Sequence, residues 1–108
     1  MVEILVDERD EIGVEKGVVI LERMAALVPE SERFPSGLKY RFQSCWSDGS
    51  LIVRYDNSND AHVSKHHKHV VEDGEELIKP ISDEPETQED LLKILEQWRR
   101  EVMDNLKE

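Results

Sequence analysis

Alternating apolar and polar positions predict that most of this chain folds as β-strands. The runs 2–6 and 18–21 are rich in β-branched residues and enclose two glycines, which is typical of a hairpin. The segment 22–28 stays open between helix and strand, because Met, Ala and Leu favour a helix while the valines before them favour a strand. Two prolines and a glycine predict a surface loop over 29–37.

The segment 38–57 has the clearest strand pattern. Asp48-Gly49 lies between two runs rich in aromatic and β-branched residues, and this dipeptide is typical of a two-residue type I′ turn. With the turn at these two residues, the predicted pairs are Ser47–Ser50, Trp46–Leu51, Cys45–Ile52, Ser44–Val53, Gln43–Arg54, Phe42–Tyr55 and Arg41–Asp56.

Side chains of this hairpin alternate between two faces of the predicted sheet. The face expected to pack on the core comprises Tyr40, Phe42, Ser44, Trp46, Leu51, Val53 and Tyr55. The opposite face comprises Lys39, Arg41, Gln43, Cys45, Ile52, Arg54 and Asp56. This second face is a cationic platform with an acid opposite Arg41. It suits an anionic ligand, and it equally suits a solvated outer face with a cross-strand ion pair.

A histidine-rich segment over 61–71 ends in two valines, which favours a strand. In that strand His67 and His69 share one face and Lys68 lies on the other. Gly74 marks a turn before the short apolar run 77–81.

The C-terminal segment predicts an amphipathic helix. Thr87 followed three residues later by Asp90 has the form of an N-cap. Apolar residues then recur at spacings of three and four, as expected for one helix face: Leu91, Leu95, Trp98, Val102 and Leu106.

These elements predict one α+β domain over 1–108. An antiparallel sheet of four to six strands within about 2–81 would pack against the C-terminal helix at about 87–106. A chain of 108 residues has room for one core.

Composition narrows the class of protein. No apolar run approaches the ~20 residues that a membrane span needs, and the acidic start lacks the basic region of a signal peptide. We therefore expect a soluble cytoplasmic protein that does not engage a membrane. A single cysteine, Cys45, excludes a disulfide scaffold and a zinc finger.

Charge is unevenly distributed along the chain. The net charge is -11, but residues 1–32 contribute -6, residues 72–108 contribute -8, and residues 33–71 contribute +3. All four histidines lie in this middle segment. An anion such as RNA would therefore be attracted there, although acidic flanks also simply keep a small protein soluble.

The histidine segment is compatible with three chemistries. In a helix, His62, His66 and His69 would share a face and could hold a metal ion, but the strand pattern weakens this arrangement. Histidines can also serve as base and acid in metal-independent RNA cleavage, with Arg41 and Arg54 stabilising charge on phosphate. Simple binding of an anion, a nucleic acid or an acidic protein is the third possibility.

The order Lys39-Tyr40-Arg41, then Arg54-Tyr55-Asp56-Asn57, then His67-Lys68-His69 resembles the TumE family of toxin proteins from toxin–antitoxin systems. The resemblance covers roughly 2–71, and the C-terminal helix adds little to it. It implies a small α+β fold, a strand rather than a helix over 17–28, and an antitoxin protein encoded nearby as partner.

We therefore expect a toxin-like protein, with metal-independent ribonuclease action as the leading hypothesis. The alternatives are a non-catalytic nucleic-acid or protein binding module and a histidine-based metal-binding protein. The candidate catalytic residues are His67, His69, Arg41, Arg54 and Asp56, and the candidate substrate-binding residues are Lys39, Tyr40, Lys65 and Lys68. Asp56 would orient Arg41 or a histidine, and Asn57 is expected to cap the turn after its strand. No cofactor and no metal ligand are assigned, and RNA and a second copy of the chain are possible partners.

Overall fold

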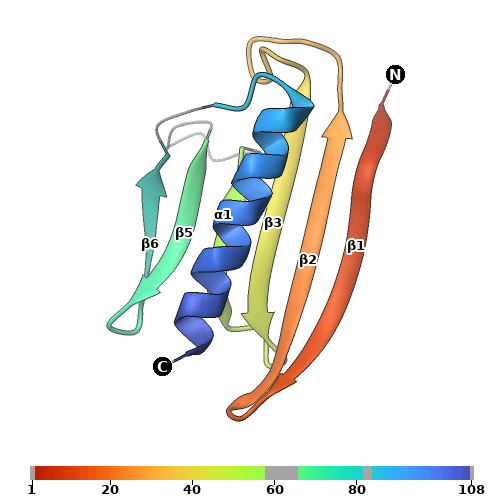
Figure 1. The fold of residues 1–108 in the computed structure, drawn as a ribbon. Coiled ribbons are helices and arrows are strands. Elements are labelled where there is room, and N and C mark those ends of the chain that lie inside the picture. Colours follow the sequence, from red (N-terminus) through yellow and green to blue (C-terminus); the bar gives the residue numbers. More distant parts are fainter. Residues whose placement is uncertain (1, 58–65, 82–83, 108) are drawn as a thin grey trace.

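A computed structural model describes residues 2–57, 66–81 and 84–107, which form one antiparallel sheet and one helix. The six strands lie in chain order across the sheet, and α1 crosses one face of it (Figure 1). The elements are β1 (Glu3–Val14), β2 (Gly17–Leu27), β3 (Leu38–Trp46), β4 (Leu51–Asp56), β5 (His67–Glu72), β6 (Glu75–Pro80) and α1 (Gln88–Leu106). The expected α+β architecture is confirmed.

The segment that was open between helix and strand is β2. It pairs along its length with β1 on one side and β3 on the other. Two ladders of backbone hydrogen bonds outweigh the helix preference of its Met, Ala and Leu residues, since local propensity is worth only a fraction of a kcal/mol per residue. The loop over 29–37 is confirmed, and Val28 N donates to Gly37 O across its base, at 2.8 Å.

The turn between β3 and β4 differs from the prediction. Gly49 has a φ of 92°, but Asp48 does not have the positive φ that a type I′ turn requires. Instead, Trp46 N donates to Ser50 O at 2.8 Å and Gly49 N donates to Trp46 O at 2.8 Å, which closes a three-residue loop. Asp48 Oδ1 stabilises this loop by accepting from Ser50 N at 2.8 Å.

A bulge in β4 compensates for the longer turn. Cys45 pairs with Leu51 but Ser44 pairs with Val53, so Ile52 is an extra residue on β4. The three predicted pairs nearest the turn are therefore wrong: Ser47–Ser50, Trp46–Leu51 and Cys45–Ile52. The four farther pairs are confirmed: Ser44–Val53, Gln43–Arg54, Phe42–Tyr55 and Arg41–Asp56. A two-residue turn in which both φ angles are positive occurs instead at Asp73-Gly74, at 53° and 79°.

The core lies between α1 and the sheet, over β3 and β4. Its buried members are Val19, Ala25, Tyr40, Phe42, Ile52, Val53 and Tyr55 from the sheet, with Leu91, Ile94, Trp98 and Val102 from α1. Ile52 was expected on the opposite face, and the bulge brings it into the core instead. Trp98 also donates its Nε1 hydrogen to Val53 O at 3.2 Å, which satisfies its only polar atom. The predicted stripe is confirmed in outline, but Ile94 is buried where Leu95 was expected, and Leu95 packs only at the margin.

Helix α1 begins where the sequence predicted. The Thr87 hydroxyl accepts from Asp90 N at 3.1 Å, and the Asp90 carboxylate accepts from Thr87 N at 3.2 Å. This capping box satisfies two backbone donors of the first turn. Within the described residues, no helix is long and apolar enough to cross a membrane.

Candidate functional site

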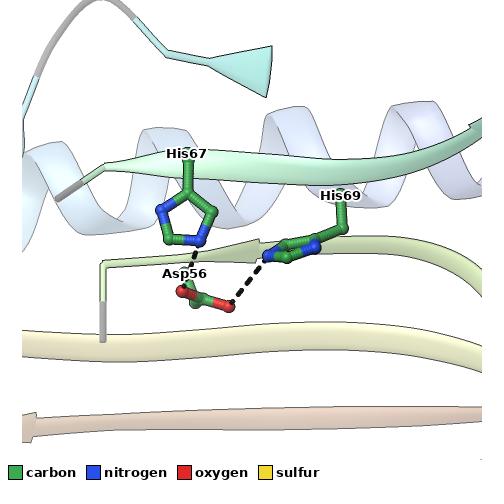
Figure 2. Close-up of side chains that lie close together, drawn as sticks. All are labelled: Asp56, His67 and His69. Atoms are coloured by element: carbon green, nitrogen blue, oxygen red, sulfur yellow. Dashed lines mark ion pairs between the residues drawn. The ribbon is translucent and has the colours of Figure 1, made fainter. Parts of the chain in front are cut away.

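Four polar side chains gather on the face of the sheet opposite α1. Asp56 pairs with His67 and Arg54 pairs with His69 across the β4–β5 ladder, so all four lie on the same face. Figure 2 shows both histidines of β5 directed toward the Asp56 carboxylate of β4. We call Arg54, Asp56, His67 and His69 the histidine–aspartate cluster.

The carboxylate of Asp56 lies between the two imidazoles. Its Oδ1 is 3.2 Å from His67 Nε2, and its Oδ2 is 4.0 Å from His69 Nε2. His67 is 1% exposed, His69 3% and Asp56 6%. A carboxylate at this depth requires charged or hydrogen-bonded partners, because desolvation disfavours its ionised form. The neighbouring imidazole and guanidinium supply those partners.

Arg54 provides the positive charge of the cluster. Its Nε is 3.1 Å from Asp56 Oδ2, and its Nη2 donates to His69 Nε2 at 3.0 Å. His69 must therefore present a lone pair at Nε2 and carry its proton at Nδ1, which is 3.7 Å from Glu76 Oε1. Burial and the nearby Arg54 charge lower the pKa of His69 below its ordinary value of 6.5. His69 is thus a neutral imidazole at pH 7.

The polar network continues onto β3. Gln43 Oε1 accepts from Arg41 Nη2 at 2.6 Å and from Arg54 Nη1 at 3.4 Å. Arg41 is opposite Asp56 in the strand register, but its guanidinium contacts Gln43, while Asp56 contacts Arg54 and His67. Of the two partners considered for Asp56, the carboxylate therefore contacts a histidine, and Arg41 is exposed at the edge of the network.

Two of the predicted substrate-binding residues lie on the helix face instead. Tyr40 is fully buried and its hydroxyl hydrogen bonds to His66 Nδ1. Lys68 Nζ donates to Glu101 Oε1 of α1 at 2.9 Å. Neither side chain reaches the histidine–aspartate cluster. Lys39 is half-buried on the same face as Arg41, and Lys65 lies outside the described residues.

The histidines do not form the helical metal face considered from the sequence. Residues 67–72 are a strand, so His66 and His69 lie on opposite faces of the sheet. His62 lies outside the described residues. A different trio does converge: Asp56, His67 and His69 each offer one donor atom, and these atoms lie within 4.8 Å of one another.

Asn57 has a structural role. Its Oδ1 accepts from Tyr40 N at 3.0 Å, and its Nδ2 donates to Leu38 O at 2.7 Å. The side chain is buried and connects the end of β4 to the start of β3. It therefore extends the β3–β4 ladder by one residue, in place of the turn-capping role expected for it.

Sequence reasoning missed two participants. Gln43 was placed on the platform without a role, although its predicted pairing with Arg54 was sufficient to suggest one. Glu76 could be found only from the β5–β6 register, which pairs it with Val71, two residues after His69 on the same face of β5. The charge pattern of the sequence contains no signal for that pairing.

Comparison with known proteins identifies the family. The family model described as Toxin TumE matches residues 2–106, which includes α1 and so extends well beyond the 2–71 expected from the sequence motifs. Searches of curated proteins and of solved structures returned no match. The matched span contains the whole histidine–aspartate cluster and nearly the entire fold, and the chain therefore belongs to the TumE toxin family.

Proposed function

We propose that this protein acts as a toxin by cleaving RNA without a metal ion, using the histidine–aspartate cluster. Membership of the TumE family makes it the toxin component of a toxin–antitoxin system, which implies an antitoxin partner. The observation that carries the proposal is a pair of neighbouring histidines on either side of the Asp56 carboxylate, of which His69 also accepts a hydrogen bond from the Arg54 guanidinium. The cytoplasmic location and a homodimer stay predictions.

The two histidines are suited to different steps. Asp56 Oδ1 lies 3.2 Å from Nε2 of His67 and orients that ring, which we assign as the general acid. His69 is neutral and has a lone pair on Nε2, which suits a general base. In this mechanism His69 takes the 2′-hydroxyl proton, the 2′-oxygen attacks phosphorus, and His67 gives a proton to the departing 5′-oxygen. The products are a 2′,3′-cyclic phosphate and a 5′-hydroxyl end.

Arg54 would link substrate binding to activation of the base. Its side chain is 25% exposed, so the cluster reaches solvent at this residue. A phosphate is a bidentate partner for a guanidinium, and binding it would draw Arg54 away from His69 Nε2. The lone pair of His69 would then be available for the 2′-hydroxyl proton.

The charge of the surrounding sheet supports an RNA ligand. The neighbouring strands β3 and β4 and all but the last residue of β5 lie within the cationic segment 33–71, whereas the edge strand β1 is acidic (Figure 1). Helix α1 packs on the opposite face of β3 and β4, away from Arg41, Gln43 and Arg54. Repulsion from the acidic parts of the molecule would therefore direct a polyanion toward this face.

The test is cleavage of total cellular RNA by the purified, antitoxin-free protein in excess EDTA. We expect wild type to cut, and His67→Gln and His69→Gln each to lower the rate by roughly 10²-fold or more. Arg41→Ala should weaken cleavage, because Arg41 lies beside the cluster. The matched control is Arg99→Ala on the exposed side of α1, which also removes one exposed cation but should leave cleavage unchanged. Mapping the 3′ ends should find 2′,3′-cyclic phosphates.

Two results would contradict the proposal. Intact RNA after incubation with folded, RNA-bound wild type would favour a non-catalytic binding module. Cleavage that persists in the His67→Gln/His69→Gln double variant would remove the histidines from the chemistry.

A further inference from the structure

We propose that Asp56, His67 and His69 also form a binding site for a divalent transition-metal ion of the Zn²⁺ type, and that this ion inhibits the toxin. The inhibitory part rests on the proposed function, but the binding part does not. The sequence assigned no metal ligand, because the three donors come from two strands whose register is known only in the folded protein.

The donor atoms are close to the spacing that such an ion requires. Zinc bonds to histidine nitrogen and carboxylate oxygen are about 2.0–2.2 Å long, which places neighbouring ligands of a tetrahedral site roughly 3.4 Å apart. The separations from Asp56 are 3.2 Å to His67 and 4.0 Å to His69, and all three donors lie within 4.8 Å. Shifts of about 1 Å or less in the imidazoles would complete three ligands of the site.

The protein already holds these ligands in place. His67 and His69 alternate onto one face of β5, directly opposite Asp56 and Arg54 of β4. Their rings are 4.9 Å apart, and the three side chains are each at least nine-tenths buried. Binding would therefore cost little side-chain entropy. Two imidazoles and a carboxylate favour a transition metal over Mg²⁺ or Ca²⁺, which prefer oxygen ligands.

Arg54 would compete with the metal ion. Its Nε and Nη2 contact the Asp56 oxygen and the His69 nitrogen that the ion would use, at 3.1 Å and 3.0 Å. The guanidinium thus supplies the positive charge that a metal would otherwise supply. An incoming ion has to displace Arg54 toward solvent, and it takes the lone pair that His69 needs as a base. Metal binding and RNA cleavage are therefore mutually exclusive at this site.

The experiment is titration of the full chain with Co²⁺, followed by its visible absorption, at a pH of about 7.5, because protons compete with the metal ion for histidine ligands at lower pH. We expect about one ion per chain, displaced by Zn²⁺. His69→Gln should weaken binding at least about tenfold. The matched control is His66→Gln, since His66 lies on the opposite face against Tyr40 and should not contribute.

Arg54→Ala is the decisive variant because it should bind Co²⁺ more tightly than wild type. A variant that fails to fold cannot produce that gain. Equal affinity in wild type, His69→Gln and Arg54→Ala, or no binding in any of them, overturns the metal site.

The RNA assay separates this inference from the proposed function. Added Zn²⁺ should stop cleavage in the absence of EDTA, and excess EDTA should restore it. Co²⁺ binding without any cleavage would reject the proposed function and keep the metal site. Cleavage that continues with the ion bound would reject the inhibition.

Discussion

At the scale of single residues, the motif Tyr55-Asp56-Asn57 divides three tasks among three neighbours. Tyr55 is buried against α1 and donates its hydroxyl hydrogen to Glu101 at 2.9 Å. Asp56 points to the opposite face and orients His67. Asn57 connects the end of β4 to β3. Strand alternation separates the first two tasks, so one motif serves both the core and the site.

Asn57→Ala tests the structural task. The substitution leaves a buried N–H of Tyr40 and a buried carbonyl of Leu38 without their partner, at 1–3 kcal/mol for each group. We expect the free energy of unfolding to fall by about 3 kcal/mol in urea denaturation. Asn105→Ala is the control, because this exposed amide also makes one backbone hydrogen bond yet should cost under about 0.5 kcal/mol. A loss below about 1 kcal/mol for Asn57→Ala would show that water replaces the two hydrogen bonds of the Asn57 side chain.

At the scale of elements, the Asp-Gly dipeptides predict where a turn lies better than they predict its geometry. The dipeptide Asp-Gly occurs at 48–49 and at 73–74, and only the second forms a two-residue turn. In the first, Asp48 Oδ1 binds Ser50 N and the β4 bulge absorbs the extra residue. Because the extra residue in β4 offsets the extra residue in the loop, Arg54 and Asp56 still pair with Gln43 and Arg41, on the face that carries the site.

Helix α1 depends on its capping box. Thr87→Ala removes the side-chain acceptor for Asp90 N, and we expect a loss of about 1 kcal/mol in the free energy of unfolding. The loss should appear in global unfolding, because α1 contributes Leu91 and Trp98 to the single core. Thr87→Ser retains the hydroxyl and should stay close to wild type. Similar losses in both variants would assign the effect to the threonine methyl group.

At the scale of the whole molecule, the net charge of -11 opposes folding through self-repulsion. Ion pairs offset little of this. The pairs Arg9–Glu11, Lys79–Glu72 and Arg99–Glu96 are exposed, and such pairs contribute less than about 1 kcal/mol each. Arg23 differs from these exposed pairs, because its buried guanidinium binds Glu8 and Asp10 of the edge strand β1.

Stability should therefore increase with ionic strength. Raising NaCl from about 20 to about 300 mM shortens the Debye length from roughly 20 to 6 Å and screens the repulsion among acidic side chains. We expect Tm to rise by a few degrees in a thermal melt. Choline chloride at equal ionic strength should act alike, which separates screening from binding of Na⁺. A fall in Tm would mean that the ion pairs outweigh the repulsion.

The sequence by itself determined the C-terminal helix, most of the strands and most of the core face of the central hairpin. Alternation placed Tyr40, Phe42 and Tyr55 in the core and Arg54 and Asp56 on the opposite face, because a strand has a side-chain period of two. Spacings of three and four residues located α1, and Thr87 marked its start. The histidines of the cluster followed from the same alternation within β5.

Only the tertiary structure decided which of these residues meet. The β4–β5 register places His67 and His69 beside Asp56 and Arg54, and the β5–β6 register adds Glu76. Strand pairing depends on hydrogen bonds between segments distant in sequence, and one bulge shifts it by a residue. Tyr40 and Lys68 also could not be placed from residue type alone. Their side chains are suited to binding a nucleic acid, but they lie on the helix face of the sheet, where Tyr40 contacts His66 and Lys68 contacts Glu101 of α1.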